Sequence, residues 1–278
     1  MRFNIFMSPE RQLLNFWWIL IFFIVLASML IPCIVLASAN GGKLAIEFQA
    51  LLIIITTVIC QRLRRASFFE VWGHIDRQWF KQLLWGIVAG TLLMLLPAIL
   101  LMFAGLLHFQ LNTIDYPSIL TSLSLFVAVA VSEELTFHGF MFQRLVNGVG
   151  VWIAQLGMSA YFLLNHSDAL ISAGSIGYLA GLNIFIAGLM FGMAYLYTKS
   201  LALPIGIHFA ANLVQGGILG FGVSGSSNNG IFTPIFDQDL PWLTGGQFGL
   251  EASIPGLLAV TGLTLFLWTY HKKMKRTM

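Results

Sequence analysis

The chain has 278 residues, of which 58% are hydrophobic and only 9% are charged, and its mean hydropathy is +0.86. Because so few charged side chains cannot cover a water-soluble globule, the composition indicates an integral membrane protein. The 14 basic and 11 acidic residues give a formal net charge of +3. The basic residues lie at the ends of apolar segments and lack the aromatic interleaving typical of nucleic-acid-binding proteins, which excludes a nucleic-acid partner.

Eight apolar segments approach the length needed to cross a bilayer, whose ~30 Å hydrocarbon core takes about 20 helical residues. They cover residues 13–37, 44–60, 83–107, 119–142, 149–164, 178–197, 203–221 and 254–270. The fourth segment has a polar centre, and the fifth is the shortest. The sequence therefore predicts an all-α, polytopic membrane protein with about eight transmembrane helices in a single integral domain, residues 1–278.

The first apolar segment ends in Ala37-Ser38-Ala39, which imitates a signal-peptidase site. Its apolar run is longer than the ~15 residues of a signal-peptide core. We therefore expect the segment to be retained as the first transmembrane helix.

The positions of the basic residues predict the orientation of the chain. If the N-terminus is cytoplasmic, 13 of the 14 basic residues face the cytoplasm and only Lys43 lies outside. The cytoplasmic set is Arg2, Arg11, Arg62, Arg64, Arg65, Arg77, Lys81, Arg144, Lys199, Lys272, Lys273, Lys275 and Arg276. This asymmetry follows the positive-inside rule and predicts eight crossings with both termini cytoplasmic. We expect a multi-pass protein of the bacterial inner (plasma) membrane.

Two connecting segments stand out between the apolar ones. Residues 61–81 combine arginines with tryptophans, which is typical of a short helix at the cytoplasmic interface. Residues 222–253 lie outside, are rich in Gly, Ser and Asn, and carry Asp237, Asp239 and Glu251. We interpret this second segment as a surface loop, with a lid as the alternative. The sequence contains no internal repeat of the kind found in many transporters.

Glu133 and Glu134 are adjacent carboxylates inside the fourth apolar segment. Glu133 lies eleven residues before the cytoplasmic Arg144, which places it about 16 Å along a helix and near the midplane. A charged side chain at this depth costs at least ~3 kcal/mol, so the pair is expected to have a function. Two carboxylates this close do not both ionise cheaply, so one of them is expected to have a raised pKa. A carboxyl group with a raised pKa can act as a general base or acid near neutral pH.

Polar groups on two other segments are candidates to join them. His208 and Asn212 are four residues apart, so both lie on one face of the seventh segment. His166 ends the fifth segment, and straight-helix counting places it nearer the outer surface. Either that segment is tilted, or His166 is not part of the site. A lone histidine in an apolar helix is more often a packing residue, but the nearby glutamate pair favours a functional site.

Three motifs resemble those of a known family. They are Glu133-Glu134 followed by Phe137-x-Gly139, Phe162-x-x-x-His166, and His208-x-x-x-Asn212, accompanied by Ala187-Gly188-Leu189-x-x-Gly192 and Leu203-Pro204-Ile205. Together they resemble the CPBP family of intramembrane glutamic endopeptidases, which includes the CAAX prenyl proteases and the bacteriocin-immunity (Abi) proteins. The resemblance covers residues 120–220.

The resemblance implies a role for each matching residue. Glu133 would activate a water molecule with help from His166, while His208 and Asn212 would form an oxyanion hole and Glu134 would support Glu133. It implies intramembrane proteolysis without a cofactor or metal. The partners would be membrane lipid and a hydrophobic or membrane-anchored peptide or protein, which reaches a site open to the cytoplasm or the bilayer.

The sequence departs from the family pattern at His138, which stands where the family has an arginine. Arginine stays charged and can bind a carboxylate through two hydrogen bonds, whereas histidine near neutral pH is only partly protonated. His138 lies four residues after Glu134, so a hydrogen bond between them is still possible. We expect a retained but retuned site, with loss of proteolysis as the alternative.

Two other classes of function compete with the hydrolase. A zinc peptidase could draw its ligands from five side chains, namely Glu133, Glu134, His138, His166 and His208. A non-catalytic membrane scaffold, binding protein or proton-coupled transporter could keep the same buried carboxylates. Asn212 favours hydrolysis, because an oxyanion hole needs this amide and a proton relay does not.

Overall fold

The fold is that of a computed structural model, which describes residues 6–7, 13–113, 115–227, 229–238 and 240–277, with side chains as far as residue 270. Several residues used in the sequence predictions lie outside this part. They are Arg2, Arg11, Asp239 and the side chains of Lys272, Lys273, Lys275 and Arg276.

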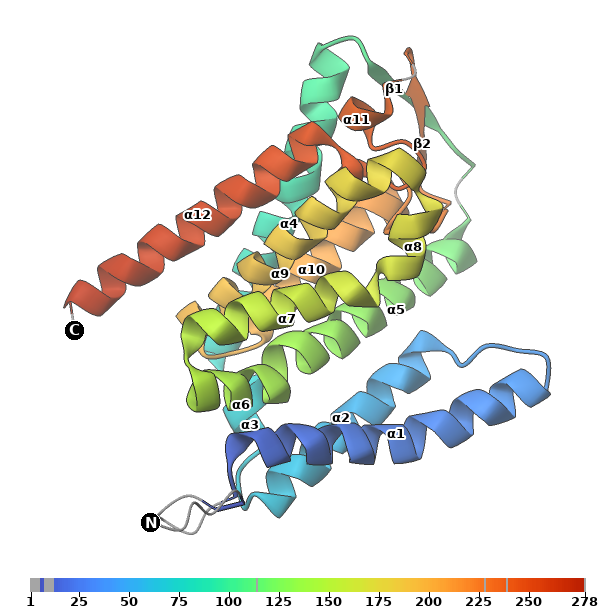
Figure 1. Cartoon of the computed structure of the whole chain (residues 1–278). Coiled ribbons are helices and arrows are strands. Elements are labelled where there is room, and N and C mark those ends of the chain that lie inside the picture. Colours follow the sequence, from blue (N-terminus) through green and yellow to red (C-terminus); the bar gives the residue numbers. More distant parts are fainter. Residues whose placement is uncertain (1–5, 8–12, 114, 228, 239, 278) are drawn as a thin grey trace.

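Helices dominate the chain (Figure 1). The α-helices are α1 (Asn15–Ala39), α2 (Ile46–Leu63), α3 (Phe69–Trp72), α4 (Arg77–Phe103), α5 (Tyr116–Glu133), α6 (Phe140–Val149), α7 (Val151–Asn165), α8 (Ser167–Ser172), α9 (Gly177–Thr198), α10 (Ala202–Asn212), α11 (Pro241–Thr244) and α12 (Ile254–Thr277). The short elements are the π-helices η1 (Glu134–Gly139) and η3 (Leu213–Ile218), the 3-10 helices η2 (Gly174–Ile176) and η4 (Leu250–Ala252), and the strands β1 (Leu107–Leu111) and β2 (Phe232–Phe236).

In the described part of the chain, five helices are long and apolar enough to cross a membrane. They are Asn15–Ala39, Ile46–Leu63, Arg77–Phe103, Tyr116–Val149 and Gly174–Thr198, and shorter apolar helices cover Val151–Asn165, Ala202–Ile218 and Ile254–Tyr270. Each coincides with one predicted segment, and the predicted all-α, multi-pass fold is confirmed. Eight crossings and two cytoplasmic termini stay predictions.

Glycines bring α4 and α10 into close backbone contact. A Cβ atom on Gly206 would lie 2.4 Å from the carbonyl oxygen of Leu83, and one on Gly90 would lie 2.2 Å from that of Ile207. Helices in lipid associate through such small-residue contacts, because no hydrophobic effect drives them together. This crossing fixes the position of α10, the helix that carries His208 and Asn212.

A second small-residue crossing joins α9 to α7. A Cβ on Gly188 would lie 3.0 Å from Ser159, and one on Gly192 would overlap the amide of Gln155. The Gly188-x-x-x-Gly192 spacing places both glycines on one face of α9. This packing explains why the motif around Gly188 requires small residues.

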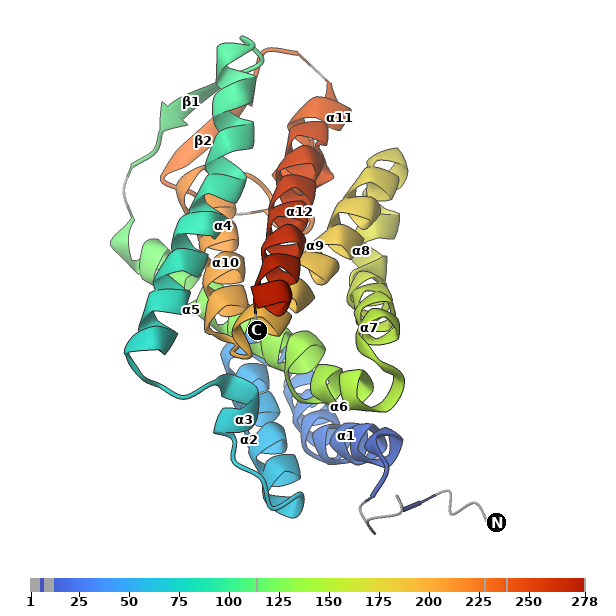
Figure 2. The same cartoon turned by 90° about the vertical axis from the view of Figure 1, so that its left-hand side faces the viewer.

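The segment expected to be a surface loop is folded. Strand β2 pairs with β1 in an antiparallel sheet, in which Leu107 lies opposite Phe236 and Leu111 opposite Phe232. Phe248 and Leu250 are buried at 2% and 0% exposure. The sheet and α11 lie together at the end of α4 away from α3 (Figure 2). The loop prediction missed this structure because the segment gains its buried contacts from distant elements, which no local pattern reveals.

Candidate active site

Glu134 is the centre of a buried polar cluster. Its side chain is fully buried, and each of its carboxylate oxygens faces one imidazole. Nδ1 of His138 lies 2.8 Å from Oε2, and Nδ1 of His208 lies 2.8 Å from Oε1. The two histidine side chains are only 1% and 8% exposed. A carboxylate with a donor on each oxygen is well satisfied at such depth.

The second ring nitrogen of His138 binds the backbone of α9. Its Nε2 lies 3.0 Å from the carbonyl oxygen of Gly188. A carbonyl oxygen only accepts hydrogen bonds, so Nε2 carries a proton and Nδ1 shares one with Glu134. His138 thus joins Glu134 to α9 through both nitrogens. The hydrogen bond expected from the spacing of these two residues is present in the structure.

The backbone that carries Glu134 and His138 is π-helical, and a second π-helical turn follows α10. Glu134 begins η1, and Asn212 directly precedes η3. Single π-helical turns inside α-helices are frequent at functional sites. A count of residues along a straight helix cannot anticipate such a turn.

Glu133 faces a cavity on the opposite side of His208 from Glu134. Its Oε2 lies 3.6 Å from Nε2 of His208, and its side chain is 22% exposed. The ring of His208 stacks on Phe191, with centroids 4.9 Å apart and planes 14° from parallel. His208 is therefore held between two carboxylates, one buried and one open to the cavity.

The cavity, with a volume of about 390 Å³, brings together the predicted site residues of three segments. Glu133, His166, His208 and Asn212 all line it. Nδ1 of His166 lies 2.8 Å from the carbonyl oxygen of Phe162, so Nδ1 donates and Nε2 of the neutral ring keeps its lone pair. The structure thus places His166 with the other candidates, a question that helix counting left open.

Sequence reasoning missed several polar residues that line the same cavity, among them Asn183, Gln215, Ser224 and Glu251. Glu251 accepts hydrogen bonds from the backbone nitrogen of Ser224 at 2.7 Å and from Nε2 of Gln215 at 3.0 Å. Asn183 could have been noticed as an amide within an apolar helix. Glu251 could not, because its segment gave no sign of returning to the site.

The cavity runs away from the face rich in arginine. From Glu133 it extends to Val223, Ser224 and Glu251. This stretch follows Phe221, whose ring contacts Phe109 of β1 and Phe236 of β2. On the arginine-rich side of His138, Phe140 and Phe142 are fully buried in the core, and Arg64 lies over the ring of Phe140. The resemblance implied an opening to the cytoplasm or bilayer, whereas this cavity leads toward the face predicted to lie outside.

The described residues do not form a metal cluster of three or more His, Cys, Asp or Glu side chains. The Nδ1 atoms of His138 and His208 both face Glu134. These three side chains are therefore directed at one another and do not converge on a common point.

A comparison with known protein families gives a match to the middle of the chain. Residues 115–214 match the family described as "Type II CAAX prenyl endopeptidase Rce1-like". This stretch contains all three motifs noted in the sequence, and the match confirms the resemblance drawn from them. No curated protein matches the chain.

Proposed function

We propose that the chain, whose residues 115–214 match the Rce1-like family of CAAX prenyl endopeptidases, hydrolyses a peptide bond with a water molecule activated by Glu133. The substrate is a hydrophobic or membrane-anchored peptide. The observation that carries the proposal is the meeting of Glu133, His166, His208 and Asn212 from three helices at one cavity.

Glu133 is the general base of this reaction. It is the carboxylate open to the cavity, whereas Glu134 is enclosed by two histidines. Glu133 takes a proton from water as the oxygen attacks the peptide carbonyl, and the proton passes to the leaving amine. His166 orients the water through Nε2, the nitrogen not bound to Phe162. General base catalysis contributes roughly 10²- to 10⁴-fold to a rate.

His208 and Asn212 supply the oxyanion hole. His208 donates through Nδ1 to Glu134, so donation through Nε2 requires the imidazolium form. That form suits a ring lying between two carboxylates. The amide of Asn212 lines the cavity one helical turn further along α10. Removing one such donor typically costs roughly 10²- to 10³-fold in kcat.

Cleavage of a peptide library by the purified protein in detergent tests the proposal. Glu133→Ala and His166→Ala should abolish turnover, and the products of the wild-type enzyme should identify the cleaved bond by mass spectrometry. Glu70→Ala, which removes a carboxylate on α3 outside the cavity, is the matched control and should retain activity. Full activity of Glu133→Ala would disprove the mechanism.

A non-catalytic binding protein of the same fold is the second candidate, and His138 is the observation that favours it. The family arginine is replaced by a group that shares its proton with Glu134. In this case the purified protein binds peptides from the library and releases no products, and His138→Arg restores cleavage.

A further inference from the structure

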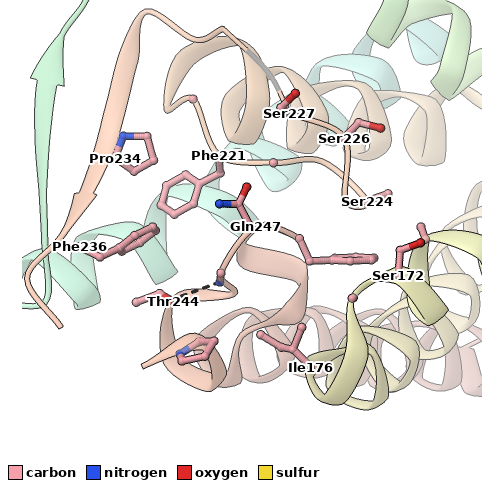
Figure 3. A pocket seen from close by; sticks show the side chains of 18 of the residues that line it. Ser172, Ile176, Phe221, Ser224, Ser226, Ser227, Pro234, Phe236, Thr244 and Gln247 are labelled. Atoms are coloured by element: carbon pink, nitrogen blue, oxygen red, sulfur yellow. Dashed lines mark hydrogen bonds between the residues drawn. The ribbon is translucent and has the colours of Figure 1, made fainter. Parts of the chain in front are cut away.

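A second cavity, called here the outer cavity, lies at the end of the molecule that carries the β1–β2 sheet. It has a volume of about 930 Å³ and lies between α8, the segment 220–227, β2 and the turn 244–248. Figure 3 shows Phe221, Pro234 and Phe236 on one side of it and Ser172 and Ile176 on the other. Its volume is within the range of ligand-binding cavities.

The outer cavity adjoins the candidate active site. Ser224 and Ser226 line both cavities, so one short stretch of backbone separates them. We call this stretch, residues 224–226, the partition. Glu251 fixes it by accepting hydrogen bonds from the backbone nitrogen and the hydroxyl of Ser224. Ser224 has a φ of +47°, a conformation that a non-glycine residue keeps only when its surroundings enforce it.

The lining of the outer cavity suits the backbone of an extended peptide. Ser227 and Gln247 offer side-chain donors and acceptors, and Phe221 and Phe248 offer apolar contact. The hydroxyls of Ser172 and Thr233 already donate to the carbonyl oxygen of Asp168 and to Oδ1 of Asn112, so they offer acceptors. An extended chain exposes its backbone N–H and C=O groups, which need such partners once they leave water. The mixture is unlike the uniformly apolar surface that would suit a lipid chain.

Among the described residues, the carboxylates that line the two cavities outnumber the one cationic group, His208, which lies between Glu133 and Glu134. Asp168 lines the outer cavity, and Glu133 and Glu251 line the inner one, without a lysine or arginine in either lining. A carboxylate on the ligand would face like charges in a partly enclosed space, which is unfavourable. Neutral or basic ligands avoid this cost.

We propose that the outer cavity is the substrate subsite that holds an extended, neutral or basic flank of the peptide, while the scissile bond lies at Glu133 beyond the Ser224–Ser226 partition. The proposal rests on the proposed function for the identity of the ligand. It places the recognised flank of the substrate on the face opposite the arginine-rich connection between α2 and α4.

Binding of fluorescent synthetic peptides tests the subsite without requiring turnover. The probes are twelve-residue peptides of Ala, Ser and Val with two lysines or two glutamates in either flank, measured by fluorescence anisotropy on Glu133→Ala protein in detergent. For one flank, the lysine peptide should bind at least about 5-fold more tightly than the glutamate peptide, as a partly exposed charge allows. Asp168→Asn should reduce that ratio, whereas Asp115→Asn, an exposed acid outside both linings, should not.

Blocking the cavity after folding gives the second measurement. Ser172→Cys protein is labelled with a bulky maleimide once purified, and its affinity for both peptides should fall at least about 10-fold. Labelled wild type controls for Cys33 and Cys60, and labelled Thr113→Cys controls for an exposed site outside the lining. Unchanged affinity in labelled Ser172→Cys, or equal affinity for lysine and glutamate peptides in both flanks, overturns the proposal.

Cleavage by the wild-type enzyme separates this proposal from the proposed function. Peptides that bind in the predicted manner without being cut support the subsite and contradict the hydrolase. Peptides that are cut equally well by labelled and unlabelled Ser172→Cys support the hydrolase and contradict the subsite.

Discussion

Nδ1 of His138 lies 2.8 Å from Oε2 of Glu134 in a site that excludes solvent from both side chains. The same carboxylate receives His208 on its other oxygen, and His138 continues to the carbonyl of Gly188. One carboxylate therefore links η1, α9 and α10. Glu134 is therefore a structural centre of the fold, and its neighbour Glu133 faces the cavity.

Glu134→Gln should destabilise the fold, and Glu133→Gln should not. The amide of glutamine cannot accept a hydrogen bond from both His138 and His208, and breaking one side of a buried ion pair costs about 3 kcal/mol. Glu133 has the same chemistry but a partly exposed side chain. Thermal unfolding in detergent measures both variants. Equal melting temperatures for the two would contradict the structural role of Glu134.

His138→Arg should keep or increase the turnover of a cleaved peptide, because a guanidinium can donate to both Glu134 and the Gly188 carbonyl. His138→Phe keeps a ring of similar size among Phe142, Phe162 and Phe191 but removes both hydrogen bonds. We expect it to lower kcat/KM at least about 10-fold, the effect of losing a charge-assisted hydrogen bond. Steady-state kinetics measures kcat and kcat/KM of the two variants. A fully active phenylalanine variant would show that the histidine is dispensable.

Gly206→Ala should disturb the site from a distance. The added methyl group would meet the backbone of α4 at Leu83 and push α10 away, at a cost of about 1 to 3 kcal/mol. Gly157→Ala on α7 is the matched control, because nothing lies within 4 Å of the position that its added methyl group would take. Unfolding and cleavage assays on both variants should show a loss for Gly206→Ala alone.

Glu251→Gln should loosen the partition between the two cavities. The variant loses charge-assisted hydrogen bonds to Ser224 and Gln215, worth about 1.5 to 3 kcal/mol, so local opening becomes roughly 10-fold or more frequent. Hydrogen exchange of peptides covering 222–227 measures this. Glu47→Gln, which alters a carboxylate bound to Ser124, serves as control. Identical exchange in the two variants would remove Glu251 as the support of this segment.

The orientation of the chain is open to direct test. Green fluorescent protein fused after residue 278 should fluoresce, and alkaline phosphatase fused after Lys43 should be active, since 13 of 14 basic residues gather on the side assigned to the cytoplasm. The opposite pattern would reverse the side from which the outer cavity is reached.

Local patterns were sufficient to predict the helices and to single out the candidate site residues. Apolar length marks a bilayer-crossing helix because every backbone polar group in lipid must be satisfied within the helix itself. Glu133 and Glu134 stand out because a carboxylate in lipid is costly. The four-residue spacing of His208 and Asn212 likewise requires only helix geometry, and both residues line the cavity.

Tertiary structure alone decided how these residues meet. Whether His166 joins Glu133 depends on where α7 ends relative to α5, and the partner of His138 on α9 depends on the crossing at Gly188. The segment 222–253 returns Glu251 to the site through contacts with residues far away in the chain. Periodicity reports which face of an element is apolar, whereas the packing of one element on another arises from contacts between side chains distant in sequence, and no local pattern encodes them.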